Sequence, residues 1–104
     1  MPDFDGLIGV LLEARQWLAR QENDFSWSSW EDAFAALAEV DALISELRSG
    51  SMPPKLDLEV LFAPTGPIQE VGLGSGWGKQ FLSLASKLDD ELTRLAQANP
   101  GLLP

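Results

Sequence analysis

Carboxylates are the only acid–base groups that this chain offers in number. It has 16 Asp and Glu but no His, Cys or Tyr. Without Cys there is no thiol nucleophile, disulfide or Cys-ligated metal, and without His the commonest general base is missing. Glycosidase-type chemistry needs only two carboxylates, and Glu59 and Glu70 could lie on facing strands. Because 16 acids produce such pairs by chance and 104 residues build a substrate cleft with difficulty, we do not expect an enzyme.

A glycine-rich segment is the second place where chemistry could occur. Every second residue from Gly72 to Gly78 is glycine. The segment fails the phosphate-loop pattern, since Leu73 stands where that pattern needs Gly and Gln80 follows Lys79. A strand before it and a helix after it would still expose N–H groups to a small anion. A ligand loop for a small anion or nucleotide-like molecule is therefore an alternative to a tight strand-to-helix connection. We predict no cofactor and no metal ion.

The net charge of −9, with a pI near 4.2, narrows the range of partners. Binding to nucleic-acid backbones needs Lys and Arg, so we exclude nucleic acid. An acidic surface favours a basic protein partner. The longest apolar run has six residues, residues 7–12, so we expect no membrane insertion. The acidic N-terminus is unlike a signal peptide, and we expect a bacterial-type cytoplasmic protein.

Four tryptophans are the remaining candidates for function. Trp17 and Trp30 fall on the apolar faces of predicted helices, which indicates core positions. Trp27 and Trp77 lie in irregular segments that precede helices. There a tryptophan either fills the edge of the core or forms a surface anchor for a partner. Both interpretations stay open for these two residues.

Apolar periodicity predicts the elements that must position these residues. Spacings of three and four predict helices over residues 7–21, 28–48 and 78–98. The second helix begins at a Ser28–Glu31 capping box or, alternatively, at Ser26 with a staple between Phe25 and Trp30. Alternation over residues 56–62 predicts a strand, and residues 68–73 a second one. The Pro- and Gly-containing turn between them predicts a β-hairpin.

The predicted fold is therefore α+β, with three helices packed on a two-stranded antiparallel hairpin in the order α-α-β-β-α. We expect a single domain over residues 1–104, ordered from about 5 to 98. The hairpin's apolar face would lie on the helices, because an isolated hairpin is marginal in water. The apolar stripe of the second helix could pack within the chain or across a homodimer.

These predictions place a candidate interaction surface at one end of the hairpin. Acidic and polar side chains there would meet a basic partner, with one or both irregular-segment tryptophans as apolar anchors. The candidate residues are Trp27, Asp57, Glu59, Thr65, Gln69, Glu70 and Trp77.

Three segments of the chain carry a resemblance. They are residues 25–31 (FSWSSWE), residues 62–70 (FAPTGPIQE) and the Gly76-Trp77-Gly78 triplet. With them the chain resembles a family of small, uncharacterised bacterial proteins, a domain of unknown function, over about residues 7–95. In size, acidity and lack of His and Cys it is also similar in type to the immunity proteins of bacterial toxin systems. That second likeness implies an inhibitor of a basic protein, such as a nuclease toxin, and neither likeness assigns a role to any residue.

Overall fold

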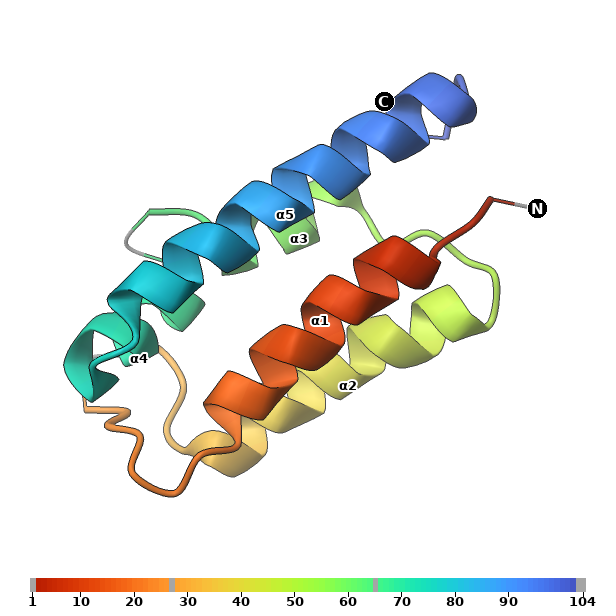
Figure 1. The fold of residues 1–104 in the computed structure, drawn as a ribbon. Coiled ribbons are helices and arrows are strands. Elements are labelled where there is room, and N and C mark those ends of the chain that lie inside the picture. Colours follow the sequence, from red (N-terminus) through yellow and green to blue (C-terminus); the bar gives the residue numbers. More distant parts are fainter. Residues whose placement is uncertain (1, 27, 65, 103–104) are drawn as a thin grey trace.

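The computed structural model describes residues 2–26, 28–64 and 66–102, and within them it contains five α-helices and no strand (Figure 1). Two long helices of the N-terminal half are followed by two short helices and a final helix of 21 residues. The bounds are α1 (Asp5–Leu18), α2 (Ala33–Arg48), α3 (Lys55–Leu61), α4 (Pro67–Ser75) and α5 (Gly78–Ala98).

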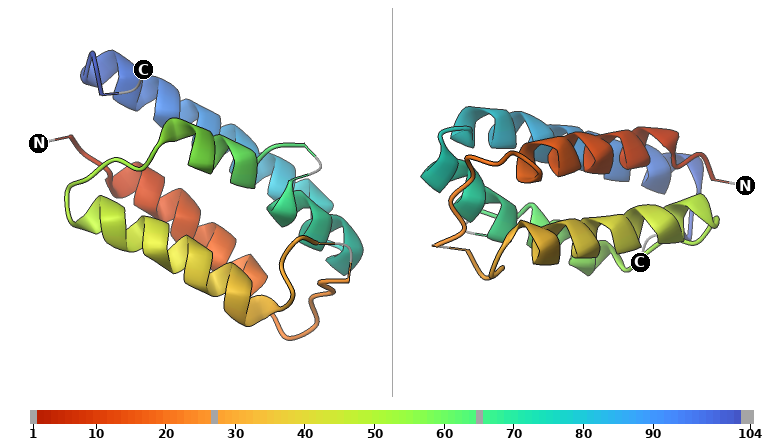
Figure 2. Two further views of the ribbon diagram at one scale, coloured as in Figure 1. Left: turned by 180° about the vertical axis from the view of Figure 1, so that it is seen from behind. Right: turned by 90° about the horizontal axis from the view of Figure 1, so that it is seen from below.

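The helices form two layers. Figure 2 shows α1 and α5 side by side in one layer, and α2, α3 and α4 in the other. The short α3 lies between α2 and α5 when the molecule is seen from behind. Helices α1 and α2 pack against each other, α1 also packs on α5, and α4 packs on the start of α5. In that view α3 therefore covers the space between the longer helices α2 and α5.

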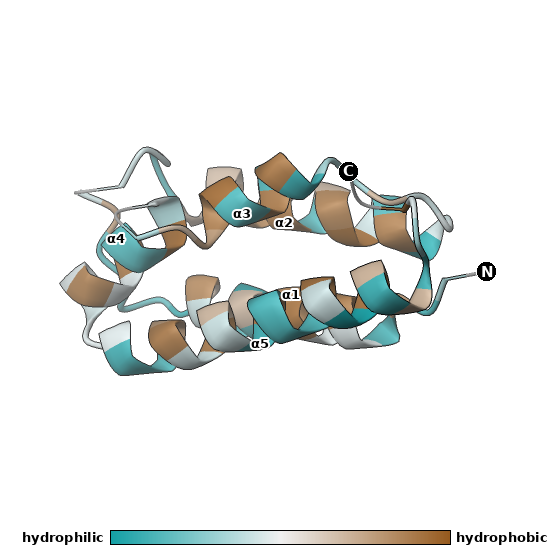
Figure 3. Cartoon of the chain, turned by 90° about the horizontal axis from the view of Figure 1, so that it is seen from above, coloured by the Kyte–Doolittle hydropathy of each residue, from teal (hydrophilic) through white to brown (hydrophobic). Residues whose placement is uncertain are grey.

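One apolar core joins all five helices. Leu11, Val40, Leu58, Ile68 and Leu88, one from each helix, are at most 1% exposed. Among the described residues no polar or charged residue is buried. Figure 3 shows hydrophobic and hydrophilic residues alternating along the helices of both layers. Burial of this apolar surface is the dominant favourable contribution to folding, because its free energy scales with the area removed from water.

The predicted α+β fold is wrong, and its first error is the segment that forms α3. Alternation predicted a strand that buries Leu56, Leu58 and Val60 together. In the structure Leu58 and Leu61 are buried, at helical spacing, while Leu56 and Val60 are exposed. Seven residues are too few for periodicity to distinguish a short helix from a strand. Burial in the core between α2 and α5 decides in favour of the helix.

The second error is the segment that forms α4. The sequence predicts Pro67 in a hairpin turn, but the structure places it in the first turn of a helix, where backbone N–H groups have no partner within the helix. Its buried residues are Ile68, Val71 and Gly72, at positions i, i+3 and i+4, which lie on one face of a helix. Because both segments are helical, the predicted hairpin does not exist.

The three long helices are confirmed, with differences at their ends. Helix α5 has the predicted bounds, whereas α1 spans Asp5–Leu18 instead of residues 7–21. Helix α2 begins later than predicted, because Asp32 is its N-cap and accepts a hydrogen bond from the Ala35 N–H at 2.9 Å. Both proposed serine caps are therefore wrong. The apolar stripe of α2, including Val40 and Ile44, is buried within the chain.

An ion pair between α1 and α2 gives a pH-dependent prediction. Arg15 Nε donates to Asp41 Oδ1 at 2.6 Å, and this hydrogen bond lowers the pKa of Asp41. The folded state thus favours the charged carboxylate. The pair stabilises the fold at neutral pH, and its contribution is lost as pH falls through the folded-state pKa, below the ordinary aspartate value of about 3.9. Both side chains are largely exposed, so we expect a small effect that salt reduces.

Asp41→Asn should therefore lower the melting temperature slightly at pH 7 in low salt and leave it unchanged at the acid end of the titration. Asp90→Asn is the matched control, since Asp90 is exposed, lies outside the ion pairs of the described residues and carries the same charge. Melting curves of the three proteins between about pH 2 and pH 7 give the comparison, because the paired carboxylate titrates below the ordinary aspartate value. Equal effects of the two substitutions at pH 7 would contradict a role for the ion pair.

Candidate interaction surface

Helix α3 carries two of the exposed large apolar side chains of the described residues. Its buried residues Leu58 and Leu61 anchor it in the core, and Phe62 directly after it is 4% exposed. Its opposite face presents Leu56 and Val60, which are 68% and 52% exposed. A helix with apolar residues on both faces is buried on both or leaves one face for a partner. The outer face of α3 is open.

A groove runs between α2 and α3, and we call it the α2–α3 groove. It has a volume of about 490 Å³, which lies within the range of ligand-sized concavities. Most of its lining residues are apolar, and the polar ones are Ser29, Glu39 and Asp57. The lining residues are Ser29, Glu39, Ala42, Leu43, Leu56, Asp57, Val60, Leu61 and Pro67.

The charge of this groove has one sign. Glu39 on α2 and Asp57 on α3 are its two ionisable residues, and no Lys or Arg from the described part of the chain lines it. Glu39 Oε2 accepts a hydrogen bond from Trp30 Nε1 at 2.5 Å, which fixes the position of this carboxylate. Trp30 itself is buried. The groove therefore combines an apolar floor with a carboxylate on each of its two helical walls.

A second concavity lies on the other side of α3, and we call it the α3–α5 hollow. It has a volume of about 390 Å³. Its rim includes Glu59, Gln69 and Asp89, and Leu82 on α5 is 61% exposed there. An adjoining concavity shares Glu59 and Asp89 and adds Lys55. This side of α3 thus carries both signs of charge, because Lys55 of the adjoining concavity accompanies the two acids.

The structure does not bring the predicted interaction residues together on one surface. Asp57 lines the α2–α3 groove, whereas Glu59 and Gln69 line the α3–α5 hollow. Glu70 lies on α4, half-buried, and lines neither of them. The hairpin end that was to hold them does not exist, since these residues lie on α3 and α4, and a partner surface formed by them stays a prediction. Two further predicted residues, Trp27 and Thr65, lie outside the described residues.

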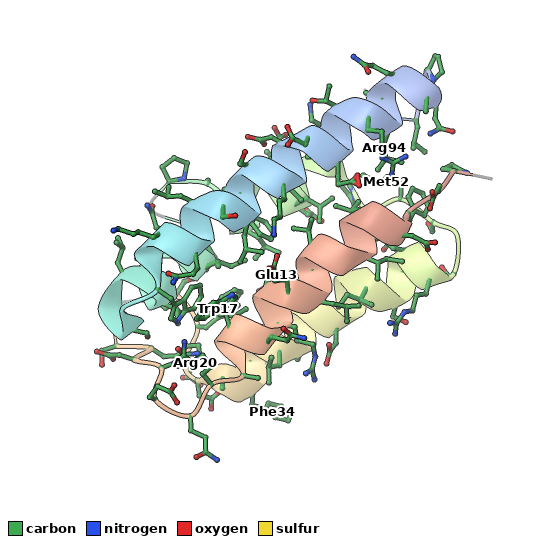
Figure 4. All side chains as sticks on the ribbon, in the orientation of Figure 1. Glu13, Trp17, Arg20, Phe34, Met52 and Arg94 are labelled. Atoms are coloured by element: carbon green, nitrogen blue, oxygen red, sulfur yellow. The ribbon has the colours of Figure 1, made fainter. Side chains whose placement is uncertain are left out.

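Trp77 fills the core and is not a surface anchor. It is 1% exposed, and its ring stacks on Trp17 with centroids 5.5 Å apart. Its Nε1 donates to Asn23 Oδ1 at 2.9 Å, so the one polar atom of the ring is satisfied. Arg20 lies over the outer face of Trp17, 4.9 Å from the ring centroid. Figure 4 shows Trp17 and Arg20 near the C-terminal end of α1, where the chain turns towards α4 and α5.

The glycine-rich segment is mostly helix and not a loop. Residues 72–75 form the last turn of α4, and only Gly76 and Trp77 separate α4 from α5. Gly76 ends α4 in the left-handed conformation, with φ of 87°, which favours glycine. A Cβ on Gly72 would lie 3.1 Å from Trp77 Cε3, so the bare backbone there makes room for the indole. The predicted strand before this segment is therefore wrong, and the tight connection joins two helices instead. The alternative of a ligand loop stays a prediction.

Glu59 and Glu70, the carboxylate pair considered for catalysis, do not line the same concavity. Glu59 lines the α3–α5 hollow, and Glu70 is not among its lining residues. Within the described ranges no three Asp or Glu side chains gather in a way that could hold a metal ion. The absence of enzymatic activity stays a prediction.

The residues that the sequence did not single out are the apolar ones of the α2–α3 groove. Leu43 lies within the predicted second helix, and Leu56 and Val60 lie within the predicted strand. The signal that could have found them is the spacing within residues 56–61. As a helix, this segment places Leu58 and Leu61 on one face and Leu56 and Val60 on another.

Comparison with family models, curated proteins and solved structures gives no significant match for this chain. The likeness to a family of small bacterial proteins and to immunity proteins therefore stays a prediction. No helix in the described part of the chain has the length and apolar character to cross a bilayer.

Proposed function

We propose that this chain is an acidic, non-enzymatic interaction domain that binds a basic protein in the cytoplasm. Inhibition of a basic enzyme, in the manner of an immunity protein, is the sharpest form of this proposal. The observation that carries it is the large excess of accessible carboxylates. Electrostatic complementarity of this kind accelerates the encounter with a basic partner and disfavours acidic ones.

The ion pairs of the structure leave this excess in place. They occupy four of the seven Lys and Arg and four of the 16 Asp and Glu. All 16 acids are described, and none of them is buried, so each can meet solvent or a partner. Few of the carboxylates therefore take part in ion pairs within the chain. The remaining ones lie on several helices and form a field that a basic surface would sense from about 8–10 Å.

Capture from native lysate tests the proposal. The tagged chain should retain a basic protein at low salt and release it at ~0.5 M salt, because salt screens the attraction. Asp57→Asn, Glu59→Gln, Asp90→Asn and Glu31→Gln combined, which neutralise four exposed acids outside the ion pairs, should weaken capture at low salt because the summed charge carries the attraction. If the partner is an enzyme, adding the chain should inhibit it. A chain that captures no salt-sensitive basic partner would contradict the proposal.

A further inference from the structure

The geometry points to a particular ligand for the α2–α3 groove: a basic amphipathic helix presented by the partner. This inference rests on the proposed function and names its site and the chemistry that the site recognises. Three observations carry it, namely the apolar surface left open on α3, the helical walls of the groove and the single sign of its charge.

The apolar surface of the groove is accessible in the free chain. Leu56 and Val60 are more than half exposed, although Leu58 and Leu61 of the same helix are buried. The volume of about 490 Å³ leaves room for several apolar side chains of a ligand. Adjacent exposed apolar residues with a polar rim are typical of an interaction site. Phe34, 82% exposed near the start of α2, is by contrast not among the lining residues (Figure 4).

The walls of the groove favour a helical ligand. The structure contains no strand within residues 2–26, 28–64 and 66–102, so no sheet edge in that part of the chain can pair with an extended peptide. Two helices that flank an apolar floor instead accept a third helix, whose residues at positions i, i+3, i+4 and i+7 fill the groove. The seven residues of α3 are about 10 Å long, which corresponds to about two turns of a bound helix.

The charge of the groove selects a basic ligand. Glu39 and Asp57 stand on opposite walls, so cationic side chains that flank the apolar face of a bound helix would meet a carboxylate on either side. A second copy of this chain brings a net charge of −9 to the same surface and would be repelled. The concavity at the start of α5, where Leu73 and Leu82 are exposed, is lined by Lys79 and lacks an acid. It serves as the internal control.

Binding of a designed peptide tests this inference. The probe is a fluorescently labelled amphipathic helix of about 14 residues, with Leu at positions i, i+3, i+4 and i+7 and Lys elsewhere. Fluorescence anisotropy at low salt gives its Kd. Leu56→Ser with Val60→Ser should weaken binding by about tenfold or more, since a few central apolar contacts dominate such interfaces. Leu73→Ser with Leu82→Ser, which removes at least as much apolar side chain from the control surface, should leave the Kd within about twofold of wild type.

Three results would overturn the inference. The first is equal weakening by the two double variants, or none by the groove variant. The second is equally tight binding of the same peptide with Glu in place of Lys. The third is a concentration-dependent dimer in sedimentation experiments that the groove variant abolishes, which would assign the groove to a second copy.

The lysate experiment separates this inference from the proposed function. If the groove variant still captures the salt-sensitive partner as wild type does, the groove assignment fails and the proposed function stands. If wild type captures no basic partner, the proposed function fails, and the peptide result still decides whether the groove recognises a basic helix.

Discussion

Replacing Trp77 by alanine is expected to lower the free energy of unfolding by about 3–5 kcal/mol, the largest effect of any single substitution considered. The indole is 1% exposed, stacks on Trp17 and packs against the bare backbone of Gly72. Its removal leaves a cavity where α1, α4 and α5 meet. It also removes the donor to Asn23, whose side-chain amide in turn donates to the Trp17 carbonyl at 2.6 Å.

Urea unfolding followed by far-ultraviolet circular dichroism measures this effect without depending on tryptophan fluorescence. Leu73→Ala is the control, since Leu73 lies on α4 close in sequence but is 66% exposed. Trp77→Phe retains an aromatic ring and should give a smaller loss, which keeps the prediction testable if the alanine variant does not fold. A change below about 1 kcal/mol for Trp77→Ala would contradict its place in the core.

The second large effect is expected in α3. Leu58→Ala and Leu61→Ala should each lower the free energy of unfolding by about 2–5 kcal/mol, because both side chains are at most 3% exposed. Leu56→Ala and Val60→Ala, on the exposed face of the same helix, should change it by less than about 0.5 kcal/mol. The four substitutions remove similar side chains from one short segment, so they control for one another.

This pattern distinguishes a helix from a strand. A strand over residues 56–62 would bury Leu56, Leu58 and Val60 on one face and expose Leu61. Equilibrium unfolding in urea gives the four values directly. Large losses for Leu56→Ala and Val60→Ala together with a small one for Leu61→Ala would restore the hairpin and remove the α2–α3 groove.

The long helices could be predicted from sequence because their periodicity extends over several turns. Helix α5 repeats Phe81, Leu88 and Leu95 at intervals of seven, and all three are buried. The short helices could not be predicted in the same way. In α3 the choice between two and 3.6 residues per repeat rests on Leu61 alone, and in α4 the preceding turn indicates a second hairpin strand over residues 68–73. The seven residues of α3 and the nine of α4 are too few to distinguish a helix from a strand by periodicity. Packing against helices that are distant in sequence decides between them.

The candidate site was predictable in its charge and not in its position. An acidic surface follows from composition, and every Asp and Glu is accessible in the structure. The apolar part of the site depends on which apolar side chains are buried in the core and which stay exposed. The sequence leaves Trp77 open as a surface anchor, but in the structure it is buried against Trp17. Leu56 and Val60 are exposed because α3 is a helix. Predicting a strand where a helix forms therefore also gives the wrong residues for the binding surface.

The most direct test of the α2–α3 groove as the binding surface is amide chemical-shift mapping. The ¹⁵N-labelled wild-type chain is titrated with the lysine-bearing amphipathic peptide, and the shift of each backbone amide is followed. We expect the largest changes in residues 39–46 of α2 and 55–61 of α3, with α5 little affected. Changes centred on residues 69–82, or spread evenly over the acidic surface, would contradict the account.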